Sequence, residues 1–192
     1  TWHGEYQPFP EVYFDNIRTH GSIPLLDWGS WVAGAGPNQP AYRLSAITSG
    51  VHDAYIRQWA ADAQAWGHPF FLRFDWQMNG TWRYPWSEQL NGNAPGEYIQ
   101  AWRHVHAIFT DAGADNVTWV WCANVAGSTT VPYADLYPGD NYVDWTCLDG
   151  YNFYAEWLEY ETVFTARGIN WLYDSNTQLQ AVAPAKPMLI VT

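Results

Sequence analysis

PFFLRFDW at residues 69–76 is the stretch that decides the fold, and VHDAYIRQWAADAQAW at residues 51–66 is the segment that leads into it. The first is a short, almost unbroken apolar run, which is typical of a strand buried in a sheet. The second repeats apolar residues at helical spacing and is followed by Gly67, a residue type that commonly ends helices. A long helix that leads into a buried strand is typical of a parallel sheet with crossover helices.

The same alternation of helical and strand-length segments continues along the chain in both directions. We expect further strands at residues 22–28, 117–122, 143–151 and 187–191, helices at 13–20 and 95–112, and broken helical structure at 162–181. Thr1 and Trp2 are expected to be the tail of one more strand. The pattern predicts a single domain of class α/β over residues 1–192, whose parallel strands form either a barrel or an open, flavodoxin-like sheet.

Polar residues at the ends of the expected strands favour the barrel. Asp27, Asp75, Asn124 and Asp149 each lie where a strand ends, and in (β/α) barrels these carboxyl ends meet at the active site. Enzymes that cleave glycosidic bonds commonly use two carboxyl groups at such a site. An Asp after a strand also commonly caps a loop or the next helix, so a structural role for Asp27 and Asp75 stays open.

Aromatic residues are unusually frequent in this chain. The 14 Trp, 13 Tyr and 8 Phe make up 18% of its 192 residues, whereas charged residues make up only 14%. A core of this size does not need so much aromatic surface. Some rings are therefore expected to line a cleft, where their flat faces suit the apolar faces of sugars.

The charge and the remaining composition argue against several classes of protein. The net charge is −11 and no basic cluster is present, so a nucleic-acid partner is not expected. No apolar run reaches the roughly 20 residues of a membrane span. The six histidines have no metal-ligand spacing, so neither a metal nor a cofactor is expected. Cys122 and Cys147 are expected either to pair, if their strands are neighbours, or to remain free in the core.

Residues 73–82, RFDWQMNGTW, form the most specific motif of the chain, and Pro85 and Trp86 follow it. The motif resembles the strand-four signature of glycoside hydrolase family 26, in which an Arg precedes a Glu-Met-Asn-Gly core and a Trp follows. The resemblance implies that Gln77 occupies the position of the catalytic acid/base Glu and that Trp82 stacks on a sugar.

Two other stretches carry the same resemblance. Residues 116–121 are similar to the family's fifth strand, and residues 137–151 are similar to the approach to its sixth. The resemblance implies a (β/α)8 TIM barrel of which this chain lacks the first and last strands. The family's nucleophile is a Glu at the end of strand seven, and its position falls at, or within a residue of, Thr192.

The resemblance implies an endo-acting, retaining β-glycan hydrolase, and mannan endo-1,4-β-mannosidase is the activity that we expect. Its partners would be β-linked polysaccharides or oligosaccharides, with mannan as the first choice, and neither a nucleic acid nor a membrane. The protein would be secreted. The residues expected to bind the sugar are Trp28, Arg73, Trp76, Asn79, Trp82, Trp86, Asp149 and Tyr151.

Gln77 sets this chain apart from the pattern that it resembles. An amide has no acidic proton to give to a leaving oxygen near neutral pH, so the chain is expected to bind glycans better than it cleaves them. The amide fits a natural loss of activity, a deliberate exchange of acid for amide that traps a ligand, or a misassigned residue. A non-catalytic carbohydrate-binding barrel, and a β-1,3-1,4-glucanase or xylanase of the same family, are the alternative functions.

Overall fold

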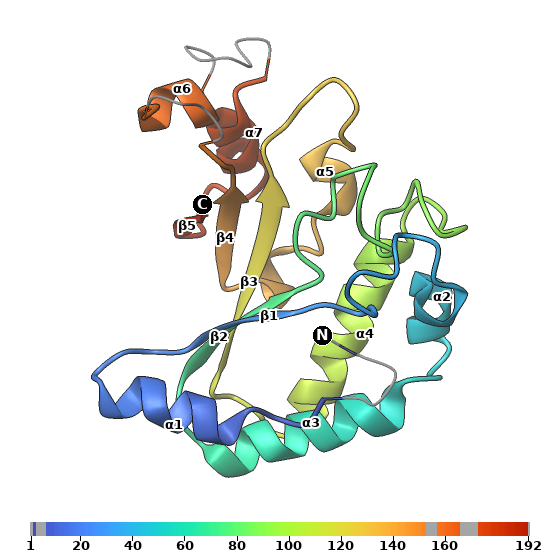
Figure 1. The fold of residues 1–192 in the computed structure, drawn as a ribbon, viewed down its shortest axis with the longest axis vertical. Helices are drawn as coiled ribbons and strands as arrows, with labels where there is room; N and C mark the ends of the chain where they lie inside the picture. The colour runs from blue at the N-terminus through green and yellow to red at the C-terminus, as the bar shows by residue number, and fades with distance from the viewer. Residues whose placement is uncertain (1, 3–6, 153–156, 166–172, 192) are drawn as a thin grey trace.

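Five parallel strands form the centre of the molecule in a computed structural model that describes residues 2, 7–152, 157–165 and 173–191. They lie side by side in chain order, as Figure 1 shows. The strands are β1 (Leu25–Trp28), β2 (Phe70–Phe74), β3 (Val117–Asn124), β4 (Trp145–Asp149) and β5 (Met188–Val191). A flavodoxin-like sheet has a point at which its strand order reverses, whereas the strands of a barrel follow one another around the ring. The observed order therefore favours the barrel.

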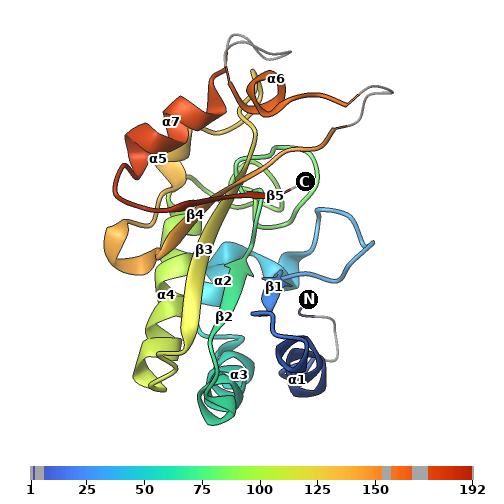
Figure 2. The ribbon, with the colours of Figure 1, turned by 90° about the vertical axis from the view of Figure 1, so that its left-hand side faces the viewer.

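Helices connect the strands and cover the sheet. Figure 2 shows α4 running alongside β3, and Figure 1 shows α6 at the end of the molecule to which β3 and β4 point. None of the helices in the described residues is long and apolar enough to cross a membrane. The helical elements are α1 (Glu11–Thr19), η1 (Pro40–Tyr42), α2 (Leu44–Thr48), α3 (Asp53–Trp66), α4 (Glu97–Asp111), α5 (Tyr133–Leu136), η2 (Asp140–Tyr142), α6 (Tyr160–Phe164) and α7 (Ser175–Val182).

Strand alternation separates an aromatic core from a polar face. Trp28 pairs in register with Phe74, and both rings lie on the side of the helices, where the Trp28 ring centroid is 4.8 Å from that of Trp59 in α3. The preceding pair in the register, Asp27 and Arg73, points to the opposite face because successive side chains of a strand alternate. The apolar rings thus stabilise the contact between sheet and helices, and charged groups are left on the other face.

The expected elements are present with shifted ends. The strand expected at 22–28 begins at Leu25, after Pro24, which has no backbone N–H to donate to the ladder. The helix expected at 95–112 spans Glu97–Asp111, because Gly96 at its N-terminus has a positive φ of 87°. The expected strand stub is not formed at Trp2, which lies in no strand and makes one backbone hydrogen bond, from its N–H to the Gly29 carbonyl; Thr1 lies outside the described residues.

The two cysteines form a disulfide, which decides between the alternatives that the sequence left open. Cys122 in β3 and Cys147 in β4 are partners in the register of neighbouring strands, and their Cα atoms are 4.2 Å apart. Both side chains are fully buried. The disulfide therefore links the two central strands close to their carboxyl ends.

Candidate active site

Arg73 links two carboxylates on the polar face of the sheet. Its Nε atom is 2.8 Å from Oδ1 of Asp27, and its Nη2 atom is 3.1 Å from Oδ2 of Asp149. The side chains of Arg73 and Asp149 are only 2% and 1% exposed, whereas that of Asp27 is 42% exposed. The ends of β1, β2 and β4 thus contribute to one ionic cluster, with its positive charge in the centre.

Burial and charge act in opposite directions on the two carboxyls of this cluster. Burial raises the pKa of Asp149 above its usual value, while Arg73 and the nearby Gln77 side chain partly offset that rise. Burial also raises the pKa of Asp27; the positive charge of Arg73 lowers this pKa, and the negative charge of the neighbouring Asp149 raises it. Arg73 thus pairs with both acids of the cluster.

Gln77 is held beside this cluster by a tightly fixed backbone. Its N–H donates to the Cys122 carbonyl at 2.7 Å, and its own carbonyl accepts from the Gly80 N–H at 3.0 Å. Its φ is +54°, a left-handed conformation that side chains other than Gly seldom adopt, and Asp75, two residues earlier, has a φ of +42°. Such conformations persist where the surrounding structure enforces them, and they are commonest at functional sites.

Asp75 has the structural role that the sequence left open. Its two carboxyl oxygens accept hydrogen bonds from the backbone N–H and the hydroxyl of Ser30, at 2.7 and 2.8 Å. Its backbone carbonyl accepts from the Tyr98 hydroxyl at 3.2 Å. Complete burial raises the pKa of Asp75 to about 8. This side chain ties the loop after β1 to the segment that carries Gln77.

Four aromatic rings pack together next to Gln77. Tyr84 stacks on Trp86 with ring centroids 4.5 Å apart, and Trp86 donates its indole N–H to the Trp76 carbonyl at 2.8 Å. The Trp31 ring meets the rings of Tyr84 and Trp86 edge-on. At Gly29, a Cβ atom would lie only 2.9 Å from the rings of Trp76 and Trp86, so only glycine fits there.

Tyr84 is a site residue that the sequence reasoning missed. Burial raises the pKa of its hydroxyl, the positive charge of Arg83 lowers it, and the negative charge of Asp149 raises it. Those interactions place the Tyr84 hydroxyl close to the ionic cluster. No pattern in the polar loop around Tyr84 distinguishes it from the chain's other tyrosines, so only the fold could identify it.

The structure brings most of the sugar-binding residues expected from the sequence into one region. Arg73 and Asp149 form an ion pair, and Gln77 lies beside Asp149. The Trp76 ring packs against Tyr84, and Tyr151 follows Asp149 at the same strand end. The Trp82 ring lies over the backbone of Gly80 and is 53% exposed, as a stacking surface requires. Thr192, the expected nucleophile position, lies outside the described residues.

Three of the expected sugar-binding residues have other roles. Trp28 packs among Trp59, Phe74 and Phe109, because it follows the inward-pointing Asp27 and must face the helices. Trp86 is fully buried and donates its indole N–H to the Trp76 carbonyl, so it holds the backbone beside Gln77.

Asn79, the third of these residues, uses both atoms of its amide on the backbone of Asn124. It accepts from the Asn124 N–H at 2.8 Å and donates to the Asn124 carbonyl at 2.9 Å. It therefore joins the loop after β2 to the end of β3. Sequence proximity to Gln77 suggested a ligand contact, but the fold directs this side chain into a structural role.

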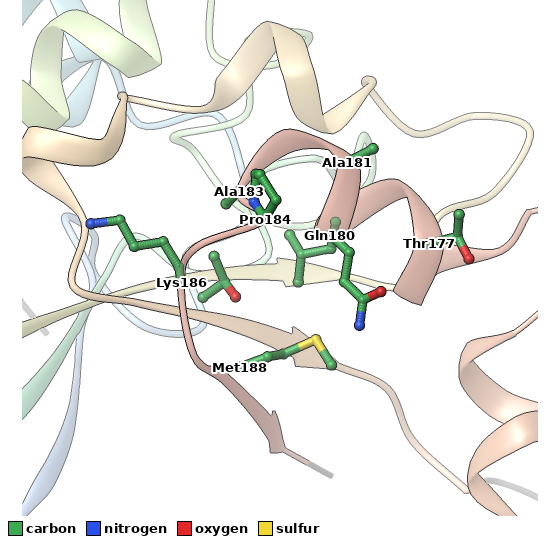
Figure 3. Close-up of a pocket in the computed structure, with 9 residues that line it drawn as sticks. Thr177, Gln180, Ala181, Ala183, Pro184, Lys186 and Met188 are labelled. Atoms are coloured by element: carbon green, nitrogen blue, oxygen red, sulfur yellow. The ribbon is translucent and has the colours of Figure 1, made fainter.

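A large groove lies away from this region. It has a volume of about 560 Å³ and is lined by Gln180, Lys186 and Met188 among others, between α7 and the sheet (Figure 3). Thr146 and Met188, its strand residues, lie at the amino-terminal ends of β4 and β5. Active sites of (β/α) barrels form at the opposite ends of the strands, so this groove is not part of the site.

Comparison with known proteins identifies relatives of the chain. The model of the family described as Glycosyl hydrolase family 26 matches residues 14–185. Endoglucanase H of Acetivibrio thermocellus is 38% identical over 166 residues, which is 80% of this chain and 17% of that protein. Mannan endo-1,4-beta-mannosidase A and B of Caldalkalibacillus mannanilyticus is 35% identical over 80 residues, 40% of this chain and 15% of that protein.

Solved structures confirm the type of fold. A GH26 beta-mannanase from Bacteroides ovatus superposes with a TM-score of 0.67 at 18% identity, over 94% of this chain and 54% of that one. A beta-mannanase from a symbiotic protist of the termite Reticulitermes speratus gives 0.69 at 18% identity, over 99% of this chain and 60% of that one. The expected (β/α)8-barrel type is thereby confirmed, and the chain spans little more than half the length of these barrel proteins.

Proposed function

Since the chain belongs to glycoside hydrolase family 26, we propose that its cleft is that of an endo-acting, retaining β-glycan hydrolase with mannan as the substrate. The observation that carries the proposal is the position of Gln77 beside the Arg73–Asp149 pair at the strand ends, next to the packed rings of Trp76 and Tyr84. A polar centre flanked by aromatic rings suits a sugar, which has polar edges and apolar faces.

Position 77 is suited to a carboxylic acid that donates a proton. A Glu there would be almost as buried as Gln77 and would lie against the negative charge of Asp149. Both effects raise a carboxyl pKa, and an acid that is still protonated near neutral pH can protonate a leaving oxygen. In a retaining enzyme the same group then deprotonates the water that releases the glycosyl intermediate. Gln77 retains the shape of this group and a hydrogen-bond donor, but it cannot supply the proton.

We assign the second carboxylate of the reaction to none of the acids of the described cluster. Asp27 and Asp149 are both engaged by Arg73, and Asp75 is engaged by Ser30. The nucleophile position at or near Thr192 therefore stays a prediction that the family resemblance supplies. With Gln77 at the acid/base position, this chain is proposed to bind glycans and to cleave them slowly.

Glucan is the alternative substrate, and a specific observation favours it. The relative with the higher identity over the longer part of the chain is named an endoglucanase, although the match covers only 17% of that protein. The relative named a mannosidase matches 40% of the chain. A non-catalytic carbohydrate-binding barrel is the second alternative, and Gln77 is the observation that favours it.

Secretion is part of the same proposal. Disulfides form and persist mainly in oxidising compartments outside the cytosol. The buried Cys122–Cys147 disulfide supports such a location, as does a polysaccharide substrate.

Calorimetric binding of sugars tests the proposed function. The panel consists of β-1,4-mannohexaose, cellohexaose and a mixed-linkage β-1,3-1,4-glucan oligosaccharide, titrated into the protein and into its Trp82→Ala and Tyr13→Ala variants. Both rings are largely exposed, but Tyr13 lies on α1, away from the strand ends, and serves as the matched control. We expect mannohexaose to bind most tightly and Trp82→Ala alone to weaken it. Tighter binding of a glucan would change the substrate, and no binding of any β-glycan would refute the proposal.

A further inference from the structure

The Cys122–Cys147 disulfide lies next to the ionic cluster and has no assigned role in the site. Cys122 and Cys147 are register partners in β3 and β4, which Figure 1 shows side by side. Two residues further along the same strands, Asn124 is the register partner of Asp149. Side chains two residues apart in a strand point to the same face, so both cysteines point to the polar face that carries Asp149. The disulfide therefore lies one row of side chains below the candidate active site.

The segment from Gln77 to Asn79 is attached to the carboxyl end of β3. The Gln77 N–H donates to the carbonyl of Cys122 itself, at 2.7 Å. The Asn79 amide accepts from the Asn124 N–H at 2.8 Å and donates to the Asn124 carbonyl at 2.9 Å. Any movement of this end of β3 therefore also moves the backbone at position 77.

Asp149 belongs to the other strand that the disulfide joins. It ends β4, and its carbonyl accepts a hydrogen bond from the Val125 N–H at 3.1 Å. Gln77 is held by β3 and Asp149 is carried by β4, so the separation of the two depends on the spacing of these strands. The ends of elements open more readily than their middles. A covalent link one row from the strand ends limits this opening.

The Arg73–Asp149 ion pair depends on the same strand spacing. Arg73 starts on β2, and its Nη2 atom is 3.1 Å from Oδ2 of Asp149 in β4. Because β3 lies between these two strands, the guanidinium group lies in front of the polar face of β3. The side chains of Arg73 and Asp149 are only 2% and 1% exposed, and the two cysteines are fully buried on the same face. The disulfide thus belongs to the buried surroundings of this ion pair.

We propose that the Cys122–Cys147 disulfide is a positioning element of the active site, which fixes the spacing of β3 and β4 and so holds the side chain at position 77 beside Asp149. The two cysteines act through the Cys122 carbonyl, which holds the backbone of residue 77, and through β4, which carries Asp149. The catalytic meaning of this assignment rests on the proposed function. The link between the disulfide and the backbone of Gln77 can be measured without a substrate.

Amide hydrogen exchange, followed by NMR in the protein without a ligand, tests this link. The variants are Cys122→Ala/Cys147→Ala and Cys122→Ala/Cys147→Val, of which the second fills more of the space that the sulfur atoms leave. The reference amide is that of Phe71, which donates to the Pro24 carbonyl at 2.9 Å between β1 and β2. We expect exchange of the Gln77 N–H to accelerate about tenfold more than that of the Phe71 N–H in both variants, because its end of β3 opens locally.

Ile108→Ala is the matched control for a general loss of stability. Ile108 is buried in α4, near the end of the helix that leads into β3, and its truncation leaves a cavity away from the carboxyl ends of the strands. A general loss of stability accelerates exchange through complete unfolding for both amides alike, so the ratio of the Gln77 rate to the Phe71 rate is expected to stay unchanged. The inference is overturned if removal of the disulfide leaves this ratio unchanged as well.

Mannan cleavage connects the disulfide with acid–base catalysis. In the Gln77→Glu background, we expect Cys122→Ala/Cys147→Val to lower kcat about tenfold with little change in KM, because a misplaced acid transfers its proton less well. Ile108→Ala is expected to keep its kcat at temperatures at which it is folded. An unchanged kcat in the disulfide variant would overturn the positioning role. If no β-glycan is bound or cleaved although exchange of Gln77 responds to the disulfide, the proposed function fails, and the disulfide supports residue 77 without a catalytic role.

Discussion

Arg73 is the residue whose removal most sharply probes the site, and Arg73→Met is the substitution of choice. Met fills much of the space of the Arg side chain without its charge. The change leaves Asp149 buried at 1% exposure without its ion-pair partner. Breaking a buried ion pair by removing one partner costs about 3–5 kcal/mol.

A second substitution shows where that cost originates. Asp149→Asn removes the stranded charge, so the double variant Arg73→Met/Asp149→Asn is expected to recover most of the lost stability. Arg57→Met is the matched control, because Arg57 forms an ion pair with Asp53 at 3.2 Å on the surface, with its own side chain 57% exposed. Exposed ion pairs contribute about 0–1 kcal/mol, so this variant is expected to lose little.

The loss of stability in Arg73→Met is also expected to depend on pH. Without Arg73, the pKa of Asp149 rises further above its unfolded value, because Arg73 lowers it in the natural protein. A carboxyl with a raised pKa in the folded state favours folding when it is protonated. The stability that Arg73→Met loses relative to the unsubstituted protein is therefore small near pH 3.8, the ordinary pKa of an Asp side chain. It grows as the pH rises through the pKa of Asp149 in the folded state, which lies above 3.8.

Urea unfolding followed by tryptophan fluorescence, at several pH values, measures these differences at a constant m value. The reasoning is refuted if Arg73→Met loses no more stability than Arg57→Met. It is equally refuted if Asp149→Asn fails to restore the loss.

Three further substitutions have expected effects on the segments that support the site. Burial raises the pKa of Asp75 to about 8 in the folded state, above the value of 3.8 for an ordinary Asp. The protonated Asp75 therefore contributes fully to the free energy of unfolding below pH 3.8, and this contribution is lost as the pH rises to about 8. Asp75→Asn keeps both contacts with Ser30 and should abolish this loss of stability, which is on the order of 5 kcal/mol. Urea unfolding at pH 4 and pH 8 measures the difference, and an unchanged pH dependence of stability in the variant would contradict the prediction. Gly29→Ala should lower the free energy of unfolding by about 1–3 kcal/mol, because the added methyl group overpacks the rings of Trp76 and Trp86. It should also weaken mannohexaose binding, whereas unchanged stability would show that the rings can move apart. Replacing Cys122 and Cys147 with Ala removes a disulfide whose cysteines have a sequence separation of 25, and it should lower the free energy of unfolding by about 3.5 kcal/mol. Thermal or urea unfolding measures this loss, and a loss below about 1 kcal/mol would count against the disulfide.

The central strands were predictable because they are buried on both faces. An apolar run such as residues 69–76 has few alternatives to a central strand, and the order of strands and helices then implies a parallel sheet. The exact ends depended on local features, such as Pro24 before β1 and Gly96 before α4. The choice between a free and a paired state of Cys122 and Cys147 needed the register of β3 and β4, which the sequence does not contain.

The site was predictable in its charged residues and less so in its rings and amides. Arg73 and Asp149 lie at strand ends, where the fold class alone implies a shared pocket. The position of Trp28 follows from that of Asp27, since neighbours in a strand face opposite sides, and a stricter use of alternation would have placed it in the core. The roles of Asn79 and Tyr84 depend on contacts between loops that are distant in sequence, and no local pattern encodes those contacts.

Cleavage of mannan by the protein and by its Gln77→Glu variant tests the role of position 77 most directly. General acid–base catalysis typically contributes about 10²–10⁴-fold, so we expect Gln77→Glu to release reducing sugar faster by that factor. An aryl β-mannoside with a good leaving group needs no protonation, so we expect both proteins to form the glycosyl intermediate from it at similar rates. If the protein with Gln77 cleaves mannan as fast as Gln77→Glu does, position 77 is not the acid/base position.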